Sequence, residues 1–360
     1  MNESRFAWQQ GSPAENGLDG KRLQEWQDGL ISHNTECLLL IRNDRIVVEW
    51  YGEGYAPDTV HYTASLAKSL VGGMSLALAM DGGLIDPLRK AAEFIPSWRD
   101  HPQKSQITVE HLATHTSGLA DAHQENVPHN HEEGWIGAFW RGRNPDSGCN
   151  SYAISIDETP LVAEPGTKFI YSNPGMAVLA YVVTASLQET PYPDLRTLLR
   201  QRVMQPIGVE DRAWSVGYGH TFMYNGLPLV ANWGGGAYTP RAAAAVGRLL
   251  LRRGDWEGRC LLGRETVDRM LAHHGTPLPR RREANRWPVP VLGWYTNADG
   301  VWPQVPVDAF CGLGAGHQFM AVIPSLNLIL VRNGGQLIPD AGTWRPVEEL
   351  VLNPPMAALT

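Results

Sequence analysis

The chain has 360 residues, of which 43% are hydrophobic and 19% are charged, a composition typical of globular proteins and not of disordered ones. This length lies above the usual size of one compact core, so we expect two lobes or one large elaborated domain. A formal net charge of −7 argues against a protein that grips the phosphates of nucleic acids. We therefore expect no nucleic-acid partner.

The sequence gives no sign of a secretory or membrane segment. Residues 1–5 lead into polar sequence without an apolar stretch of signal-peptide length, and no run is long enough to span a bilayer. The cysteines have no short Cys-x-x-Cys spacing, which predicts packed, reduced thiols; they are Cys37, Cys149, Cys260 and Cys311. We expect a cytoplasmic protein that has no membrane partner.

In chain order, the first strong signal is a β-hairpin near the N-terminus. Apolar, β-prone runs at 37–41 and 46–50 flank the turn residues Asn43 and Asp44. Near the C-terminus, runs at 319–323 and 328–331 flank a Pro-Ser-Leu-Asn turn and predict a second hairpin. Two terminal hairpins favour one antiparallel sheet that is built from both ends of the chain.

The middle of the chain is predicted to be mainly helical. Helix-compatible spacing or composition occurs in five segments: 65–80, 177–187, 195–203, 240–252 and 264–273. No internal repeat or low-complexity segment is present, so a solenoid is excluded. We predict an α/β protein in which helices flank the sheet, with an α/β lobe of residues 1–82 plus 288–360 and a mainly helical inserted lobe of residues 83–287.

The first candidate for chemistry is the pair Ser65 and Lys68. If Ser65 begins a helix, Lys68 projects from the same face and can reach the serine hydroxyl. A serine hydroxyl needs a neighbouring base at neutral pH, and a lysine can be that base when burial or a nearby cation lowers its pKa. The same spacing also arises by chance, as a helix N-cap followed by a surface lysine, so the pair alone leaves both interpretations open.

A second polar group lies at Tyr171 and Asn173, between a Glu-Pro-Gly-Thr turn and a predicted helix. A loop of this kind can present the Tyr171 phenol beside Ser65 and Lys68, and the Asn173 amide towards a substrate. An ammonium beside a phenol lowers the pKa of the phenol, so either Tyr171 or Lys68 could be the base. Taken singly, a half-buried aromatic and a helix cap are the simpler interpretations of Tyr171 and Asn173.

Together, the two groups resemble motifs of the serine β-lactamase and penicillin-binding protein superfamily. The likeness is greatest to its class C branch, with the related family VIII carboxylesterases and D-amino-acid amidases. Segments 107–119 and 234–241 are similar to the family's threonine-histidine-threonine-serine-glycine and glycine-rich segments. The motifs follow the expected order from about residue 38 to residue 335. The resemblance implies the β-lactamase/transpeptidase-like fold, an active site between the two lobes, Ser65 as nucleophile and no cofactor.

The resemblance also implies a third motif, a Lys-Thr-Gly or His-x-Gly triplet on an edge strand. Within 312–318 it places Ala315, Gly316 and His317 in the triplet, to within one residue, so that the backbone N–H groups of Gln318 and Ser65 would form the oxyanion hole. His317 would contact the substrate, or else be a packed strand histidine. In penicillin-recognising relatives a strand cation helps to bind a carboxylate; this stretch has no lysine, so we expect an ester or an uncharged amide.

Two further features have more than one interpretation. Three aromatic residues of the insert 121–157 either form a wall over the pocket or fill the helical lobe: Trp135, Phe139 and Trp140. A His-rich segment could supply zinc ligands from His123, His129, His131, Glu132 and Glu133. Its spacing matches no closed structural zinc site, so we predict a solvated loop and no metal.

The sequence therefore predicts a serine hydrolase that forms an acyl-enzyme on Ser65. The substrate is expected to be a small-molecule ester or uncharged amide. The alternatives are a β-lactamase, a D-Ala-D-Ala-type peptidase, and a receptor that is acylated without turnover. Because Ser65, Lys68, Tyr171 and Asn173 are all present, the receptor is the weaker alternative. The oligomeric state cannot be read from the sequence.

Overall fold

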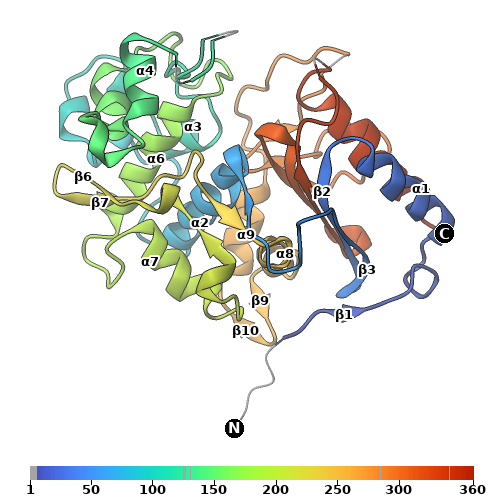
Figure 1. Ribbon diagram of the computed structural model, residues 1–360. Helices are drawn as coiled ribbons and strands as arrows, with labels where there is room; N and C mark the ends of the chain where they lie inside the picture. Colours follow the sequence, from blue (N-terminus) through green and yellow to red (C-terminus); the bar gives the residue numbers. More distant parts are fainter. Residues whose placement is uncertain (1–5, 125–126, 130, 284, 340) are drawn as a thin grey trace.

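The computed structural model describes residues 6–124, 127–129, 131–283, 285–339 and 341–360. Within these ranges the largest sheet has eight strands in the order β1-β3-β2-β15-β14-β13-β12-β11 (Figure 1). All neighbours in it are antiparallel except β1 and β3, which are parallel. Its strands are β1 (Gln9–Gln10), β2 (Thr35–Arg42), β3 (Arg45–Tyr51), β11 (Val289–Pro290), β12 (Tyr295–Thr296), β13 (Phe310–Gly314), β14 (Gln318–Ile323) and β15 (Leu328–Gly334).

Both predicted hairpins are confirmed. The turn between β2 and β3 places Asn43 and Asp44 at φ values of 55° and 60°, the left-handed conformation that a tight hairpin turn requires. β14 and β15 are joined by a short 3₁₀ turn, Pro324–Leu326. Strand β15 pairs with β2, so the two chain ends form one sheet, as predicted.

The sheet is buried on both faces, which explains why its central strands are almost entirely apolar. Leu38 and Leu40 of β2 pack in one core with α1 (Gly20–Ile31) and the C-terminal helical residues. Leu39 and Ile41 alternate to the other face and pack in the second core, which includes α8 (Pro240–Leu251). The sheet is thus a layer between two sets of helices. The set that includes α8 shares its core with the buried residues that follow Ser65.

All five predicted helical segments are helical, with differences at their ends. The segment after Ser65 begins as a 3₁₀ turn, Ala64–Leu66, and a π-helix, Lys68–Gly73, before α2 (Met74–Asp81). The other segments are α6 (Asn173–Ser186), α7 (Leu195–Leu199) with a π-helical turn at Arg200–Met204, α8, and α9 (Arg264–Leu271). Helices that the sequence did not predict are α1, α3 (Val109–Ala113), α4 (Gly134–Arg141), α5 (Ser151–Ala153) and α10 (Asn353–Ala357).

The described residues form three further, small sheets. One joins β4 (His61–Tyr62), β8 (Ala237–Tyr238) and β5 (Trp214–Ser215). The others pair β6 (Phe222–Tyr224) with β7 (Leu227–Leu229), and β9 (Asp255–Trp256) with β10 (Arg259–Cys260). The first of them matters for function, because β4 leads directly into the turn that carries Ser65.

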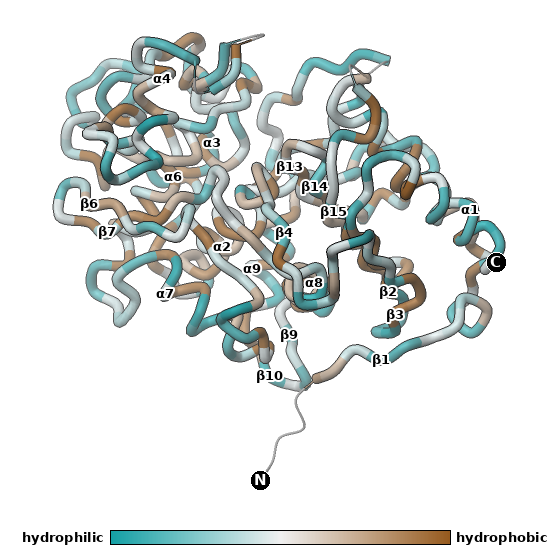
Figure 2. The backbone as a smooth tube through the Cα atoms, in the orientation of Figure 1, coloured by the Kyte–Doolittle hydropathy of each residue, from teal (hydrophilic) through white to brown (hydrophobic). Residues whose placement is uncertain are grey.

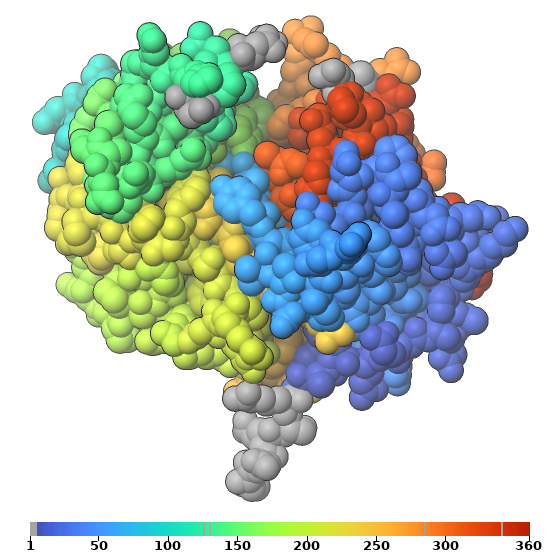
Figure 3. Space-filling view, in the orientation of Figure 1, coloured from blue at the N-terminus to red at the C-terminus, as the bar shows by residue number. Residues whose placement is uncertain are grey.

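The helices α2 and α6 form the apolar interior of the mainly helical region, and their backbone is brown in Figure 2. In Figure 3, green and yellow residues of that region border the blue and red residues of the sheet region, with light-blue residues near 60 between them. Helix α8, which lies within the predicted 83–287 lobe, packs on β14 and β15. The exact division into lobes stays a prediction. No helix among the described residues is long and apolar enough to cross a membrane.

Candidate active site

Ser65 stands in the tight 3₁₀ turn that follows strand β4. The preceding residue, Ala64, has a φ of 46°, a left-handed conformation that is strained for a residue with a side chain. Thr63 holds this turn in place, because its N–H and its hydroxyl both donate to the backbone oxygen of Gly236, at 2.9 and 3.0 Å. Ser65 itself is half-buried. Ser65 is therefore presented from a fixed turn at the start of an otherwise buried helix.

Lys68 lies one turn after Ser65, with its Nζ 3.1 Å from the Ser65 Oγ. The same nitrogen donates to the Asn173 Oδ1 at 2.7 Å and to the backbone oxygen of Trp233 at 2.8 Å. These two acceptors hold two of the N–H groups, so the remaining position on the nitrogen faces the Ser65 hydroxyl. In the ammonium form that position carries a proton, and in the neutral amine it carries the lone pair.

The environment of Lys68 favours the neutral amine. Lys68 is only 4% exposed. Burial lowers the pKa of Lys68 to about 7, against the opposing effect of the Asp121 charge. A substantial fraction of the amine is therefore neutral near pH 7, and its lone pair then faces the hydroxyl that must lose a proton. This is the arrangement that a general base requires.

Tyr171 approaches Ser65 from another side and donates from its Oη to the Ser65 Oγ at 2.8 Å. Burial raises the pKa of the Tyr171 phenol, and the hydrogen bond to Ser65 only partly opposes the rise. The sequence predicts a lowered pKa from the neighbouring ammonium, and that prediction is wrong. The Lys68 Nζ lies 4.8 Å from the ring centroid, over the ring, so desolvation outweighs its influence on the phenol.

His115 contacts the segment that carries Tyr171. Its Nδ1 accepts a hydrogen bond from the Ser172 N–H at 3.2 Å, and its ring centroid lies 4.6 Å from that of Tyr171. Burial, together with the nearby Lys68, lowers the pKa of His115 to about 3, so the ring is neutral. The sequence pointed to the segment that contains His115 but gave this residue no role. The sequence could not show that the His115 ring accepts a hydrogen bond from the Ser172 N–H, because the two residues meet only in the folded chain.

Asn173 begins helix α6 and is held by Asp121. The Asn173 backbone N–H donates to the Asp121 Oδ1 at 2.8 Å, and its side-chain Nδ2 donates to the same oxygen at 2.9 Å. Burial raises the pKa of Asp121, while Asn173 and the Lys68 charge lower it. Sequence reasoning missed Asp121, because a single aspartate in a loop carries no motif. The structure thus brings four predicted residues together, Ser65, Lys68, Tyr171 and Asn173, and adds Asp121.

The third predicted motif lies next to Ser65, but in a different conformation. Gly314, the last residue of β13, is so close that a Cβ there would lie 2.9 Å from the Ser65 nitrogen and 2.2 Å from the Thr63 oxygen. Ala315–His317 forms a 3₁₀ turn and not a strand, and β13 is an inner strand. The prediction of an edge strand at these residues is wrong, because Gly316 and His317 have φ values of 73° and 54°, which end the strand.

The side chains of the turn are engaged within the protein. His317 is buried, and its Nδ1 accepts from the Leu337 N–H at 3.2 Å, as in a packed histidine. The Gln318 side chain donates from its Nε2 to the Gly334 oxygen at 2.5 Å. The roles of Gly316 and His317 towards a substrate, and of the Gln318 N–H in the oxyanion hole, stay predictions.

The aromatic residues of the insert belong to the helical interior. Phe139 is fully buried, with its ring centroid 5.2 Å from that of Trp233. Trp140 is also buried, and its Nε1 donates to the Ala122 oxygen at 2.7 Å. Trp135 is half-buried and packs against the same core. These rings fill the helical region, and Trp140 supports the segment that holds Asp121.

Three side chains of the His-rich segment place their ligand atoms within 4.8 Å of one another: His123, His129 and Glu132. One Glu132 oxygen accepts from the Gln124 N–H at 2.8 Å, and the other lies 3.2 Å from the His129 Nδ1. His131 and Glu133 are exposed and do not join this group. Hydrogen bonds within a loop account for the arrangement. That the protein needs no metal stays a prediction.

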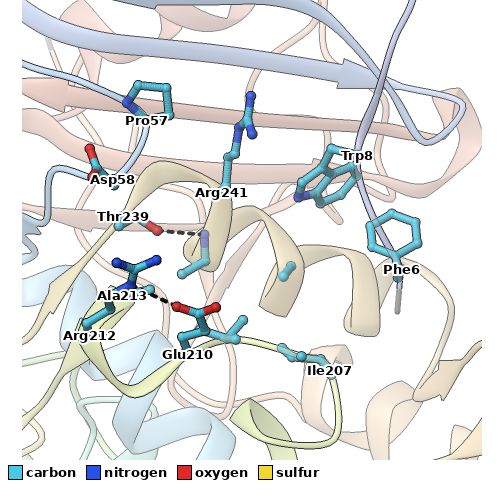
Figure 4. A pocket seen from close by; sticks show the side chains of 14 residues that line it. Phe6, Trp8, Pro57, Asp58, Ile207, Glu210, Arg212, Ala213, Thr239 and Arg241 are labelled. Carbon is cyan, nitrogen blue, oxygen red and sulfur yellow. Dashed lines mark hydrogen bonds and ion pairs between the residues drawn. The ribbon is translucent and has the colours of Figure 1, made fainter. Parts of the chain in front are cut away.

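A cavity near the N-terminal segment is separate from the group around Ser65. It has a volume of about 540 Å³ and lies between Phe6, Trp8 and the start of α8 (Figure 4). It shares no lining residue with the recess beside Ser65, Lys68 and Tyr171, whose volume is about 10 Å³. That recess has room for about one water molecule. A substrate must therefore reach the half-buried Ser65 from outside the recess.

The family follows from comparison with known proteins. The family model described as Beta-lactamase matches residues 36–349, most of the chain. The chain belongs to the beta-lactamase family. It is a serine hydrolase, as the sequence predicts. Over 347 residues this beta-lactamase family member is 27% identical to 6-aminohexanoate-dimer hydrolase of Paenarthrobacter ureafaciens, an alignment that covers 92% of this chain and 80% of the relative.

Solved structures confirm the fold of this beta-lactamase family member. A family VIII carboxylesterase superposes with a TM-score of 0.67 at 17% identity, covering 95% of this chain and 99% of the other. A penicillin-binding protein homologue from Caulobacter crescentus superposes with a TM-score of 0.68 at 15% identity, again covering 95% and 99%. At these identities the likeness shows the fold alone, which is the β-lactamase/transpeptidase-like fold that the sequence predicts.

Proposed function

We propose that this beta-lactamase family member hydrolyses a carboxylic ester or an uncharged amide through an acyl-enzyme on Ser65. The observation that carries the proposal is the setting of the Lys68 amine. Asn173 and Trp233 bind two of its N–H groups, so its third position faces the Ser65 Oγ at 3.1 Å. Because its pKa is about 7, this amine can accept the Ser65 proton near neutral pH.

The proposed cycle divides the proton transfers between two groups. Lys68 takes the Ser65 proton as the oxygen attacks the carbonyl carbon, and the N–H groups of Ser65 and Gln318 hold the oxyanion. Tyr171, whose phenol is protonated at the start of the cycle, donates its proton to the leaving group, and the proton on Lys68 then replaces it. Water attacks the acyl-enzyme with Lys68 as base, and Ser65 recovers its proton.

The preference for an ester or neutral amide rests on what surrounds Ser65. Residues 312–318 contain no lysine or arginine, and the neighbouring Arg332 is fully buried and donates to the backbone oxygens of Gly316 and His317, so neither offers a cation to a carboxylate. The names of two similar proteins, a 6-aminohexanoate-dimer hydrolase and a carboxylesterase, support this class of reaction. We further propose that the substrate is a small molecule and that the protein works in the cytoplasm, with neither nucleic acid nor membrane as a partner.

Intact-mass spectrometry with p-nitrophenyl butyrate and a fluorophosphonate tests the proposal. The wild type should turn over the ester and carry a single fluorophosphonate adduct, whereas Ser65→Ala should do neither. Ser97→Ala, a change at an exposed serine outside the site, should retain both. A stable acyl adduct without turnover would favour a receptor. Near-wild-type turnover in Ser65→Ala would end the proposal.

Substrate panels on the same preparation separate the remaining activities. Nitrocefin reports β-lactamase activity, and D-amino-acid p-nitroanilides report peptidase or amidase activity. We expect kcat/KM for the ester to exceed that for nitrocefin. A higher kcat/KM for nitrocefin would identify a β-lactamase instead.

A further inference from the structure

Arg143 follows helix α4 and lies within cation–π distance of two aromatic rings. Its guanidinium carbon is 5.4 Å from the ring centroid of Trp140 and 5.8 Å from that of Tyr218. Such rings attract a cation and restrict its movement without neutralising its charge. The side chain is half-buried, so it is held in place while part of it stays accessible.

The Trp140 side of Arg143 leads to the catalytic group by direct contacts. The Trp140 Nε1 donates to the Ala122 oxygen at 2.7 Å. The preceding residue, Asp121, accepts from the Nδ2 of Asn173 at 2.9 Å, and Asn173 binds the catalytic amine. The ring that holds Arg143 therefore lies against the segment that orients the active site.

A second set of contacts connects Arg143 to the Lys68 amine through Tyr218 and the segment 233–235. The Tyr218 ring covers Gly235, where a Cβ would lie 2.4 Å from it, and its Oη would lie 2.7 Å from a Cβ at Gly234. Gly234 follows Trp233, whose backbone oxygen accepts from the catalytic amine at 2.8 Å. Exposed Tyr62, three residues before the nucleophile, has its Oη 3.7 Å from the same Gly234 position. Arg143 is thus linked by two chains of contacts to residues that bind the Lys68 amine.

Arg143 forms no ion pair with a carboxylate of the described residues. Two other arginines, by contrast, are paired with a carboxylate, whereas Arg42, Arg196 and Arg332 donate to backbone oxygens. Arg241 binds Glu49 through two hydrogen bonds of 2.7 Å, and Arg248 binds Asp44 at 2.8 and 2.9 Å. A guanidinium that is partly desolvated and has no carboxylate partner can bind an anion without first losing an existing ion pair.

We propose that Arg143 binds a carboxylate of the substrate, several bonds away from the ester or amide that Ser65 attacks. The substrate class is then a small ester, or an amide whose reacting end is uncharged, that carries a carboxylate several bonds from the bond that Ser65 attacks. This inference rests on the proposed function and deepens it. The planar guanidinium matches a carboxylate through two parallel hydrogen bonds. The cation is linked to the site through Trp140 and Tyr218 and not through residues 312–318, so it does not take the place of the lysine that this stretch lacks.

The test compares esters of equal size with and without a carboxylate. The p-nitrophenyl monoester of glutaric acid carries the carboxylate on the acyl side, and p-nitrophenyl valerate is its neutral counterpart. Butyrate esters of 3-hydroxybenzoic acid and of phenol form the same pair on the leaving-group side. The enzymes are the wild type, Arg143→Met, which keeps the apolar stem, and Arg143→Lys, which keeps the charge. Arg141→Met at an exposed neighbour is the matched control.

We expect Arg143→Met to lower kcat/KM for one of the two anionic esters by roughly 10-fold, mainly through KM, because a half-exposed charge pair is lost. The neutral esters should change less than about 2-fold, since they never use the charge. Arg143→Lys should recover part of the loss, and Arg141→Met should match the wild type. Which anionic ester responds tells whether the carboxylate lies on the acyl or the leaving-group side.

A binding measurement separates this inference from the proposed function. In Ser65→Ala protein, calorimetry with the same esters needs no turnover. Tighter binding of an anionic ester than of its neutral counterpart, lost in Ser65→Ala/Arg143→Met, supports the role of Arg143 even if no ester is hydrolysed. Equal binding of both, or an equal loss on neutral and anionic esters in Arg143→Met, overturns it and leaves the proposed function standing.

Discussion

The amide oxygen of Asn173 accepts a 2.7 Å hydrogen bond from the Lys68 amine. The amide can face only this way, because its Nδ2 donates to Asp121 at 2.9 Å. Asp121 thus determines which atom of Asn173 meets Lys68, although it does not touch Lys68 through a hydrogen bond itself. This chain of contacts orients the lysine lone pair towards Ser65.

The pKa of Lys68 predicts the pH dependence of the reaction. Lys68 acts as a base only when its amine is neutral, and its pKa is about 7. We therefore expect kcat/KM to rise with pH up to about 7 and to level off above it, with a tenfold loss per pH unit on the acid side. The pH profile of p-nitrophenyl ester hydrolysis at constant ionic strength measures this. A profile that is flat from pH 5 to pH 9 would contradict Lys68 as base.

Replacement of Asp121 should move that profile. Asp121→Asn keeps an oxygen for Asn173 but removes the negative charge that raises the pKa of Lys68. The acid limb of kcat/KM should then shift to lower pH, because the neutral amine persists in more acidic solution. Asp100→Asn, at an exposed aspartate, should leave the limb unchanged. An unshifted limb in a folded Asp121→Asn protein would show that the charge does not reach Lys68.

Lys68→Ala and Tyr171→Phe should fail in different ways. Each should lower kcat by roughly 100-fold or more on an alkyl ester, because each removes a proton-transfer group. On a p-nitrophenyl ester, whose leaving group departs without an acid, Tyr171→Phe should lower kcat much less. Lys68→Ala should lower kcat on both esters. Tyr192→Phe, at a partly buried tyrosine elsewhere, is the control. Equal losses of Tyr171→Phe on the two esters would exclude Tyr171 as the acid.

Gly314→Ala should disrupt the site by steric contact. A Cβ at this position would meet the Thr63 oxygen at 2.2 Å and the Ser65 nitrogen at 2.9 Å, both of them backbone atoms that cannot rotate away. We expect a loss in kcat of roughly 10-fold or more, because β13 must move away from the Ser65 turn. Gly29→Ala, where a Cβ meets no atom within 4 Å, should keep full activity. Unchanged kcat in Gly314→Ala would show that this contact is not needed.

Chelation should not affect the enzyme. The proposed mechanism uses no metal, and Glu132 of the His-rich segment is already bonded to a backbone N–H. We expect EDTA, and His129→Ala, to leave kcat within about 2-fold of its original value. Metal analysis of protein purified without a His-tag completes the test. Zinc in stoichiometric amount that is lost together with activity would contradict the metal-free mechanism.

Much of the fold could be predicted because its signals are local. The hairpin turn at Asn43 and Asp44 lies between two apolar runs, and that pattern is complete within some 15 residues of sequence. The π-helix after Lys68 and the turn at Ala315–His317 could not be predicted in this way. Their backbone conformation is imposed by neighbours from distant parts of the chain, as the contact of Gly314 with Ser65 shows.

The sequence by itself determined which groups can react: Ser65, Lys68, Tyr171 and Asn173 are named by their spacing and their order along the chain. Only the tertiary structure decided what each of them does. Burial separates the pKa values of Lys68 and Tyr171, one lowered and the other raised, and on this difference the proposed division into base and acid rests. Asp121 meets Asn173 only through contacts made after folding, and the same holds for Arg143 in its proposed role. Desolvation and hydrogen bonding depend on which distant segments meet, and spacing along the chain does not record that.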